Sequence, residues 1–195
     1  MQAPNHAAGP DVELTHPGWA AAGATHAIGQ AHAPDGRLLR ARDIAQRLGA
    51  IADSNAWIAE VAALNGSFAV VGRRGGEVRA MVDRLRSLPL FYTAAGGSIR
   101  ISDRADGLVS SERPALDAES RLEFQYAGYV TGEDTLIPGV RQIRAGHVLL
   151  HEGAKDEPRQ VCYYAFRHCN FLDGGDDELS SRLREAGYEP VEGGI

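Results

Sequence analysis

The side chains best suited to bind a metal are few, and they are not spaced to share one. Cys162 and Cys169 lie seven positions apart, with His168 as the one neighbouring imidazole. His26 and His32 fall on one expected strand without a third ligand nearby. Zinc sites take three or four such protein ligands. We therefore expect reduced thiols and surface imidazoles, with no metal and no other cofactor.

The charge pattern argues against a polyanionic partner. The 195 residues include 26 acidic and 20 basic side chains, a net charge of -6, and the longest basic run is Arg73-Arg74. A nucleic-acid backbone would meet no continuous stretch of cations. Apolar runs are short, and residues 1–10 carry neither a basic segment nor an apolar core. We expect no membrane association, no secretory signal and a cytoplasmic protein.

The elements that must position any site follow from periodicity. Apolar residues three and four apart predict helices at 42–48 and 55–64, and Asp117 and Asp176 are expected to cap two later helices. Short β-prone runs separated by glycine-containing turns predict antiparallel hairpins. These expected strands are 24–32, 67–71, 78–82, 90–93, 98–102, 146–151 and 160–166. Many short strands with grouped helices predict an α+β fold.

The chain is expected to hold one main domain with two extensions. Residues 1–17 are rich in Pro, Ala, Asn and His without periodicity, which predicts a flexible N-terminal arm. Residues 18–172 contain the predicted strands and three of the helices, enough for one core. Residues 173–195 are expected to form a helix and a tail that resemble a linker.

Three segments follow one another in an informative order. Residues 64–71 read LNGSFAVV, residues 83–92 read DRLRSLPLFY and lead to Ser102-Asp103, and the third segment runs from Tyr129 to His147. They resemble the patterns L-[DN]-G-x-F-A, D-R-x-G-x-x-P-L-[FY]-Y and G-Y-[IV] … T-[LI]-[FY]-x-G-[IV] … [LI]-x-[PA]-G-H. Those patterns belong to the N-terminal class II glutamine amidotransferase domain of the asparagine synthetase family.

The resemblance implies a four-layer αββα sandwich of the Ntn-hydrolase type, in which two antiparallel sheets lie between helical layers. Most matching residues are expected to serve this scaffold. Gly66 would allow a close backbone approach or an unusual dihedral, and Asp83 and Arg84 would form a buried ion pair that braces loops. The expected structural residues are Asn65, Gly66, Asp83, Arg84, Pro89, Gly139, Gly146 and His147.

The chemistry implied by the resemblance needs an N-terminal cysteine, whose α-amino group acts as the general base. Position 2 is Gln2, and the first cysteine is Cys162. We therefore expect a degenerate domain without a catalytic residue for glutamine hydrolysis. Thr15 or Thr25, if processing exposed it, would be an alternative nucleophile.

The glutamine pocket implied by the resemblance is also altered. Asp35, Gly36 and Arg37 take the place of the Asn-Gly-Glu segment, so a carboxylate replaces the amide that donates to the oxyanion. Asp53 matches the aspartate that binds the substrate ammonium, although a role as a helix N-cap is the favoured explanation. These four residues are the expected remains of a substrate pocket.

These features predict an accessory subunit for a separate synthetase-type partner. Gly174-Gly175 precedes the last helix without the Ser-Gly-Gly-x-Asp-Ser loop that holds pyrophosphate in synthetase domains. A homo-oligomer is the alternative assembly. Two other functions stay open: an active glutamine-hydrolysing amidotransferase with an unrecognised nucleophile, and a small-molecule binding module in the altered pocket.

Overall fold

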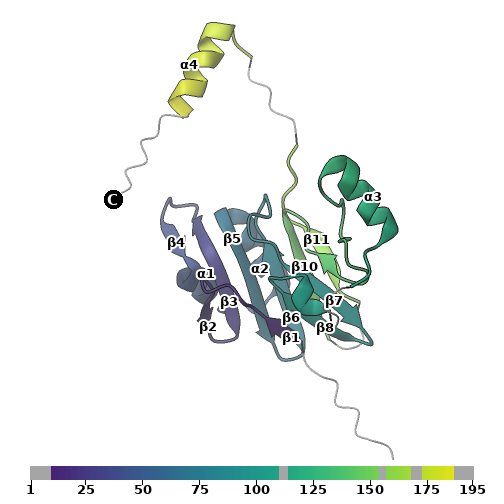
Figure 1. Cartoon of the computed structure of the whole chain (residues 1–195). Helices are drawn as coiled ribbons and strands as arrows, with labels where there is room; N and C mark the ends of the chain where they lie inside the picture. The colour runs from purple at the N-terminus through teal and green to yellow at the C-terminus, as the bar shows by residue number, and fades with distance from the viewer. Residues whose placement is uncertain (1–9, 110–113, 154–156, 168–172, 187–195) are drawn as a thin grey trace, which may run out of the picture. The chain divides into compact units, whose positions relative to one another are not determined.

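The computed structural model describes residues 10–109, 114–153, 157–167 and 173–186 of the chain (Figure 1). The chain divides into two units, Met1–Ala165 and Phe166–Ile195, so the second unit begins before the expected boundary at 173. The first unit contains two sheets and the helices α1 to α3. The second contains α4 (Asp176–Ala186). The fold is α+β, and no helix among the described residues is both long and apolar enough to cross a membrane.

The larger sheet, sheet B, is antiparallel throughout and has the order β11-β10-β6-β5-β3-β2, with β4 paired to β3. Within this sheet, β3 pairs with β5 over the full length of β3. The strands are β2 (Ala20–Ala22), β3 (Thr25–His32), β4 (Leu38–Arg40), β5 (Asn65–Arg74), β6 (Glu77–Val82), β10 (His147–His151) and β11 (Arg159–Cys162).

The smaller sheet, sheet A, has the order β1-β8-β7-β9. It is formed by β1 (Asp11–Glu13), β7 (Phe91–Ala95), β8 (Ser98–Ser102) and β9 (Arg141–Gln142), and the 3-10 turn η1 (Asp106–Leu108) follows β8. Its edge strand β1 runs parallel to β8. The expectation of two purely antiparallel sheets is therefore wrong for this edge, since β1 reaches β8 from a distant part of the chain rather than through a hairpin.

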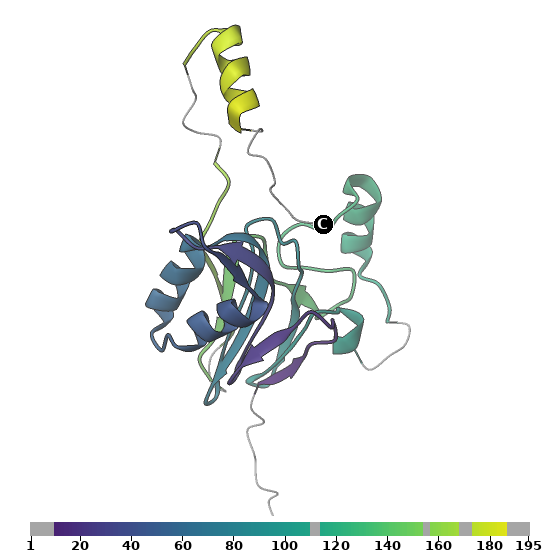
Figure 2. The same ribbon diagram turned by 90° about the vertical axis from the view of Figure 1, so that its left-hand side faces the viewer.

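Two apolar cores hold three layers together. The helices α1 (Ala41–Gly49) and α2 (Ser54–Ala63) cover one face of sheet B, where Trp57 and Phe68 are buried (Figure 2). Sheet A covers the other face, where Tyr92, Ile101 and Leu149 are buried. Alternate residues of β5 and β10 therefore contribute to different cores, as the two-residue period of a strand requires.

Helix α3 (Ala118–Ala127) stands apart from these layers. Its predicted N-cap is confirmed, because the Asp117 carboxylate accepts a hydrogen bond of 2.8 Å from the Ser120 amide. Gly128 ends it in the left-handed conformation. The helix does not pack along either sheet, and no α-helix in the described ranges covers the outer face of sheet A. The described residues thus form three of the four layers expected.

The segment before β2 is folded where a flexible arm was predicted. Residues 11–13 form β1, and the Asp103 carboxylate accepts hydrogen bonds from the backbone amides of Thr15 and His16. The prediction of a flexible arm over 1–17 is therefore wrong for residues 10–17, and residues 1–9 lie outside the described ranges. The stabilising partners lie almost ninety positions away, so no local sequence pattern indicates them.

Asp83 forms a buried corner that joins β5, β6 and the following turn. Its carboxylate accepts hydrogen bonds from the amides of Phe68, Leu85 and Ser87 and from the Ser87 hydroxyl. The expected ion pair with Arg84 is wrong, because the amides already satisfy this carboxylate. Arg84 instead donates to Ala62 O and Asn65 Oδ1 and lies over the Tyr164 ring.

Two of the expected scaffold glycines are required by close backbone contacts. A Cβ on Gly66 would lie 2.3 Å from Gln30 O, and one on Gly146, which has φ of +66°, would lie 2.3 Å from Tyr164 O. The Gly66 expectation is therefore confirmed as a close approach between β3 and β5. The neighbouring His147 ring nitrogen contacts Ala145 O, and Pro89 precedes β7 as expected. Gly139, with φ of +77°, sits in a turn.

Arg86 is the one non-glycine residue with positive φ in the described ranges, at 56°. That conformation costs about 1 kcal/mol or more for a residue with a Cβ. Its guanidinium donates to the Gln142 side chain. Both Arg86→Ala and Arg86→Gly lose this bond, but only the glycine variant relieves the backbone. We expect Arg86→Gly to be more stable than Arg86→Ala by about 1 kcal/mol in urea unfolding.

The neighbouring Leu85 provides the matched comparison, because its side chain is exposed and its φ is not positive. There the order should reverse, with Leu85→Ala more stable than Leu85→Gly. Equal stability of the two Arg86 variants would show that the left-handed backbone carries no strain.

Candidate functional site

The expected pocket residues Asp35, Gly36 and Arg37 lie in the turn between β3 and β4. The Asp35 carboxylate accepts a hydrogen bond of 3.0 Å from the Arg37 amide, and Gly36 has φ of +81°. The turn closes through hydrogen bonds between Ala33 and residues 36 and 37. The carboxylate therefore stabilises its own turn.

Asp53 lies at the N-terminus of α2, where its carboxylate accepts a hydrogen bond of 2.8 Å from the Ala56 amide. The preceding residue, Ala52, accepts from Arg79. In the sheet, Arg79 on β6 pairs with Gly72 on β5, and Gly72 pairs with Thr25 at the start of β3. The Asp35 turn follows the opposite end of this eight-residue strand. The structure does not bring Asp53 to Asp35, Gly36 and Arg37.

The expected metal-binding candidates are likewise separate. His26 and His32 lie six positions apart on β3. The pKa of His26 is lowered by burial and by the charge of Arg73. Cys162 is exposed at the end of β11, whereas His168 and Cys169 lie outside the described residues. Within the described ranges no three His, Cys, Asp or Glu side chains converge on one point.

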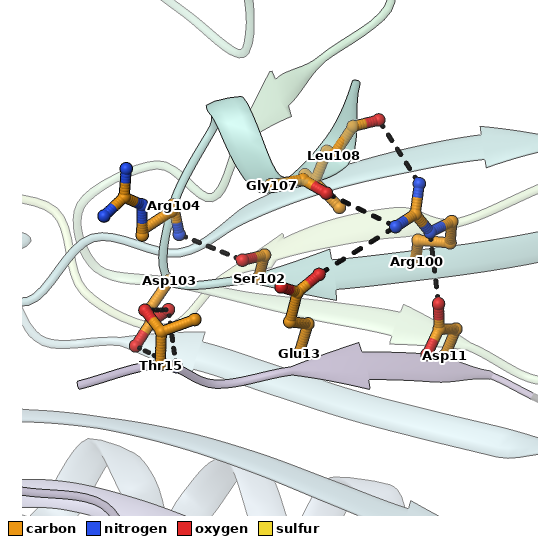
Figure 3. Close-up of polar contacts among 9 residues, drawn as sticks. All are labelled: Asp11, Glu13, Thr15, Arg100, Ser102, Asp103, Arg104, Gly107 and Leu108. Atoms are coloured by element: carbon orange, nitrogen blue, oxygen red, sulfur yellow. Dashed lines mark hydrogen bonds and ion pairs between the residues drawn. The ribbon is translucent and has the colours of Figure 1, made fainter. Parts of the chain in front are cut away.

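A more organised polar site lies where the segment after β1 meets the end of β8 (Figure 3). The Asp103 carboxylate there accepts three hydrogen bonds from Thr15, two from the amide and one of 2.9 Å from the hydroxyl. It also accepts from the His16 amide at 2.9 Å and from Trp19 Nε1 at 2.8 Å. One carboxylate therefore fixes the whole 15–19 segment.

Arg100 holds the other half of the same junction. Its guanidinium lies 3.1 Å from the Asp11 carboxylate and 4.0 Å from that of Glu13, and it donates to the carbonyl oxygens of Gly107 and Leu108 (Figure 3). The side chain thus ties β1 to η1 across the edge of sheet A. These pairs are partly exposed, so they position the strand more than they stabilise the fold.

A cavity of about 360 Å³ opens beside Asp103. Its apolar wall is made by Trp19, Ile28, Leu88 and Pro89, while Thr15, His16, Asp103 and Arg104 complete the rim. An apolar cavity with a few convergent polar groups is the usual form of a small-molecule site. The hydrogen bond from Trp19 Nε1 to Asp103 positions one part of the apolar wall.

The electrostatics of Asp103 do not suit a general base. Burial by itself would raise the pKa of this carboxyl, but the hydrogen bonds from His16, Thr15 and Trp19 outweigh burial and lower it. The Thr15 hydroxyl points its proton at this weakly basic carboxylate. His16 Nδ1 accepts from the Gly18 amide and is not bonded to Thr15. The three side chains therefore do not form the hydroxyl–imidazole–carboxylate relay of a hydrolase.

A scan against protein-family models and a search of curated proteins find no match to this chain. Its function must therefore be inferred from its own residues.

Sequence patterns alone indicate little of this site. Ser102-Asp103 belongs to one family-like segment, so a signal for Asp103 is present. Thr15 is predicted only as an alternative nucleophile, and no sequence pattern predicts a role for Trp19 in the site. A tryptophan after Pro17 and Gly18 in a polar segment is the one local feature that suggests an anchored side chain.

We expect Asp103→Ala to release the 15–19 segment while leaving the two cores intact. The amide protons of Thr15 and His16 would lose their acceptor, and their hydrogen exchange should become at least about tenfold faster. Native-state exchange followed by NMR measures this directly. Asp106→Ala, which removes an exposed partner of Arg104, is the control and should leave both rates unchanged.

The pH dependence of this anchor has a defined sign. The pKa of Asp103 is lower in the folded state than its unfolded value of about 3.9. Its contribution to folding stability is therefore fully present above the unfolded pKa and is lost as the pH falls through the folded pKa. The Trp19 indole Nε1–H resonance should therefore stay constant down to about pH 4 and shift below it. A shift centred well above that pH would contradict the anchoring role.

Proposed function

We propose that this chain is an accessory domain related to the class II amidotransferase domains of the asparagine synthetase family, without glutaminase activity of its own, that serves a separate synthetase-type partner. The observation that carries the proposal is the separation of Asp35 and Asp53 along β3. A glutamine pocket needs the oxyanion donor and the ammonium-binding carboxylate around one substrate. Here each carboxylate accepts from its own turn or helix amide instead.

The scaffold residues support the relation to that family. Asp83 joins two of the family-like segments to its own, because the Phe68 amide donates to its carboxylate and the Gly146 amide donates to its carbonyl oxygen. Arg86 occupies the glycine position of the pattern D-R-x-G and keeps a left-handed backbone. The finer assignment to a four-layer Ntn-hydrolase sandwich belongs to this proposal.

The alternative of an active enzyme requires a nucleophile with a free α-amine. Thr25 is buried inside the β2–β3 hairpin, so a chain end there would remove β2 from the sheet. The Thr15 amide nitrogen and hydroxyl both donate to Asp103. Cys162 is the last residue of β11, so a chain end there would remove β11 from sheet B. None of these groups is arranged as an N-terminal nucleophile with its own base.

The test combines an activity assay with a partner assay. Purified full chain incubated with glutamine should form no glutamate above a protein-free blank, even at high protein concentration. Tagged full chain recovered from its native host should bring down ATP–pyrophosphate exchange activity, the signature of an adenylating synthetase. Glutamate formation, or a recovered fraction without exchange activity, would contradict the proposal.

A second candidate function, small-molecule binding, is favoured by the cavity beside Trp19. A thermal-shift screen with amino acids and nucleotides tests it, because a ligand at a hundredfold excess over its dissociation constant stabilises the fold by about 2.7 kcal/mol. A true ligand of this cavity should lose its effect in Asp103→Ala. A flat response across the screen would remove this candidate.

A further inference from the structure

The segment around α3 concentrates exposed apolar side chains. Nine large hydrophobic residues are exposed in the described ranges, and five of them lie between positions 116 and 129. Tyr126 is 90% exposed and Leu122, one turn earlier, is 55% exposed. The other three are Leu116, Phe124 and Tyr129. An apolar cluster of this kind on a folded surface marks an interaction site rather than a random surface.

This cluster is rigidly held. Asp117 caps the helix, its backbone amide donates to Leu136 O at 3.0 Å, and Ser120 is buried. Thr135 stabilises that loop through hydrogen bonds to Ile137 O and Val140 O. Leu122, Phe124 and Tyr126 therefore project from a helix whose N-terminal end is held by these hydrogen bonds.

A cavity of about 740 Å³ between α3 and the 131–140 loop extends this surface. Leu122, Tyr126 and Ile137 supply apolar lining. The charged residues that line it are all acidic: Asp117, Glu119, Glu123 and Asp134. Within the described ranges, Glu119, Glu123 and Asp134 form no ion pair. The surface thus combines apolar side chains with acidic ones.

We infer that this surface, the α3 groove, binds a cationic amphipathic helix of a partner protein. Leu122 and Tyr126 are one helical turn apart, the spacing that packs against apolar residues of a second helix. Lys or Arg side chains flanking that apolar stripe would meet the carboxylates of Glu119, Glu123 and Asp134. The α3 backbone is already bonded within the helix, so an added strand has no free edge to pair with.

This inference deepens the proposed accessory role, because it names the surface and the chemistry through which a partner would attach. The two can fail separately. Glutamate formation would contradict the proposed function without bearing on the groove, while a groove that binds no cationic helix would leave the glutamine result unchanged.

The test uses the full chain and two fluorescein-labelled synthetic peptides of 18 residues with identical leucine positions, one carrying Lys and one Glu on the polar face. Fluorescence anisotropy at 50 mM and 300 mM NaCl gives the affinities. The Lys peptide should bind at 50 mM and weaken by about tenfold or more at 300 mM, since these exposed charges are screened. The Glu peptide should not bind.

Variants assign the binding to the groove. Leu122→Ser combined with Tyr126→Ser should raise the dissociation constant by about tenfold or more. Glu119→Gln, Glu123→Gln and Asp134→Asn together should weaken binding at 50 mM and remove most of its salt dependence. Leu85→Ser, which changes an 82% exposed leucine elsewhere, is the control and should have no effect.

Other occupants of the groove are outcomes of the same experiment. If a second copy covers it, sedimentation velocity will show a dimer that the Leu122, Tyr126 double variant dissociates. If α4 covers it, Leu179→Ser with Leu183→Ser will increase peptide affinity. Either result overturns the inference, as does equal binding of the Lys and Glu peptides or no binding of the Lys peptide at about 100 µM.

Discussion

Asp83→Ala should destabilise the first unit by about 3 kcal/mol or more, and the protein is expected to unfold at a much lower urea concentration. Asp83 is 1% exposed, and its carboxylate accepts hydrogen bonds from the amides of Phe68, Leu85 and Ser87. Alanine would leave these donors without an acceptor in a largely dry environment. Each buried donor left unsatisfied costs about 1–3 kcal/mol. The midpoint and slope of urea unfolding measure the loss.

Two variants control for shape and for charge. Asp83→Asn keeps the side-chain volume and one acceptor oxygen, so it should be less damaging than alanine, although its NH₂ group would face amide donors. Asp106→Ala removes an exposed carboxylate and should leave the unfolding midpoint unchanged. If Asp83→Ala matched Asp106→Ala, the corner would not be a source of stability.

Gly66→Ala should be the second most damaging change. The added Cβ would lie 2.3 Å from Gln30 O and 2.6 Å from Ala31 Cα, both backbone atoms of β3. These atoms cannot rotate away, so β3 and β5 would have to separate where Gly66 pairs with Ala31. Forced overpacking typically costs about 1–3 kcal/mol, and a backbone clash belongs at the upper end or beyond. Thermal and urea unfolding both report it.

Gly76→Ala is the matched control for this prediction. Gly76 lies in the β5–β6 turn with an ordinary φ, and an added Cβ there would have nothing within 4 Å. Its stability should stay within about 0.5 kcal/mol of the parent chain. A loss of similar size at positions 66 and 76 would mean that the strand approach is not the cause.

Local patterns predicted most elements near their observed bounds. The helices expected at 42–48 and 55–64 correspond to α1 and α2, and the expected strand 98–102 is β8. The N-cap of Asp117 is also confirmed. These features depend on neighbours within a few positions, which is the range over which sequence reasoning works.

Features that depend on distant partners were not predicted. The 15–19 segment is ordered by Asp103, which no local pattern connects to it. Gly29 was not singled out, yet a Cβ there would lie 2.1 Å from Ser67 O across the β3–β5 pair. Asp35 and Asp53 were grouped by resemblance, but the path of α1 carries the chain to the other end of β3. Periodicity identifies helices and strands, but it does not show how the chain runs between them.

The corner at Asp83 and Arg84 also has a mechanical consequence. The chain leaves the first unit through Tyr163 and Tyr164, whose amides both donate to Gly146 O. The Tyr163 hydroxyl donates to Val82 O, and the Arg84 guanidinium covers the Tyr164 ring at 4.6 Å. A force applied through the second unit would therefore act on these contacts of Tyr163 and Tyr164 before it acted on either sheet. Single-molecule stretching from the C-terminal side should register their rupture as the first force peak.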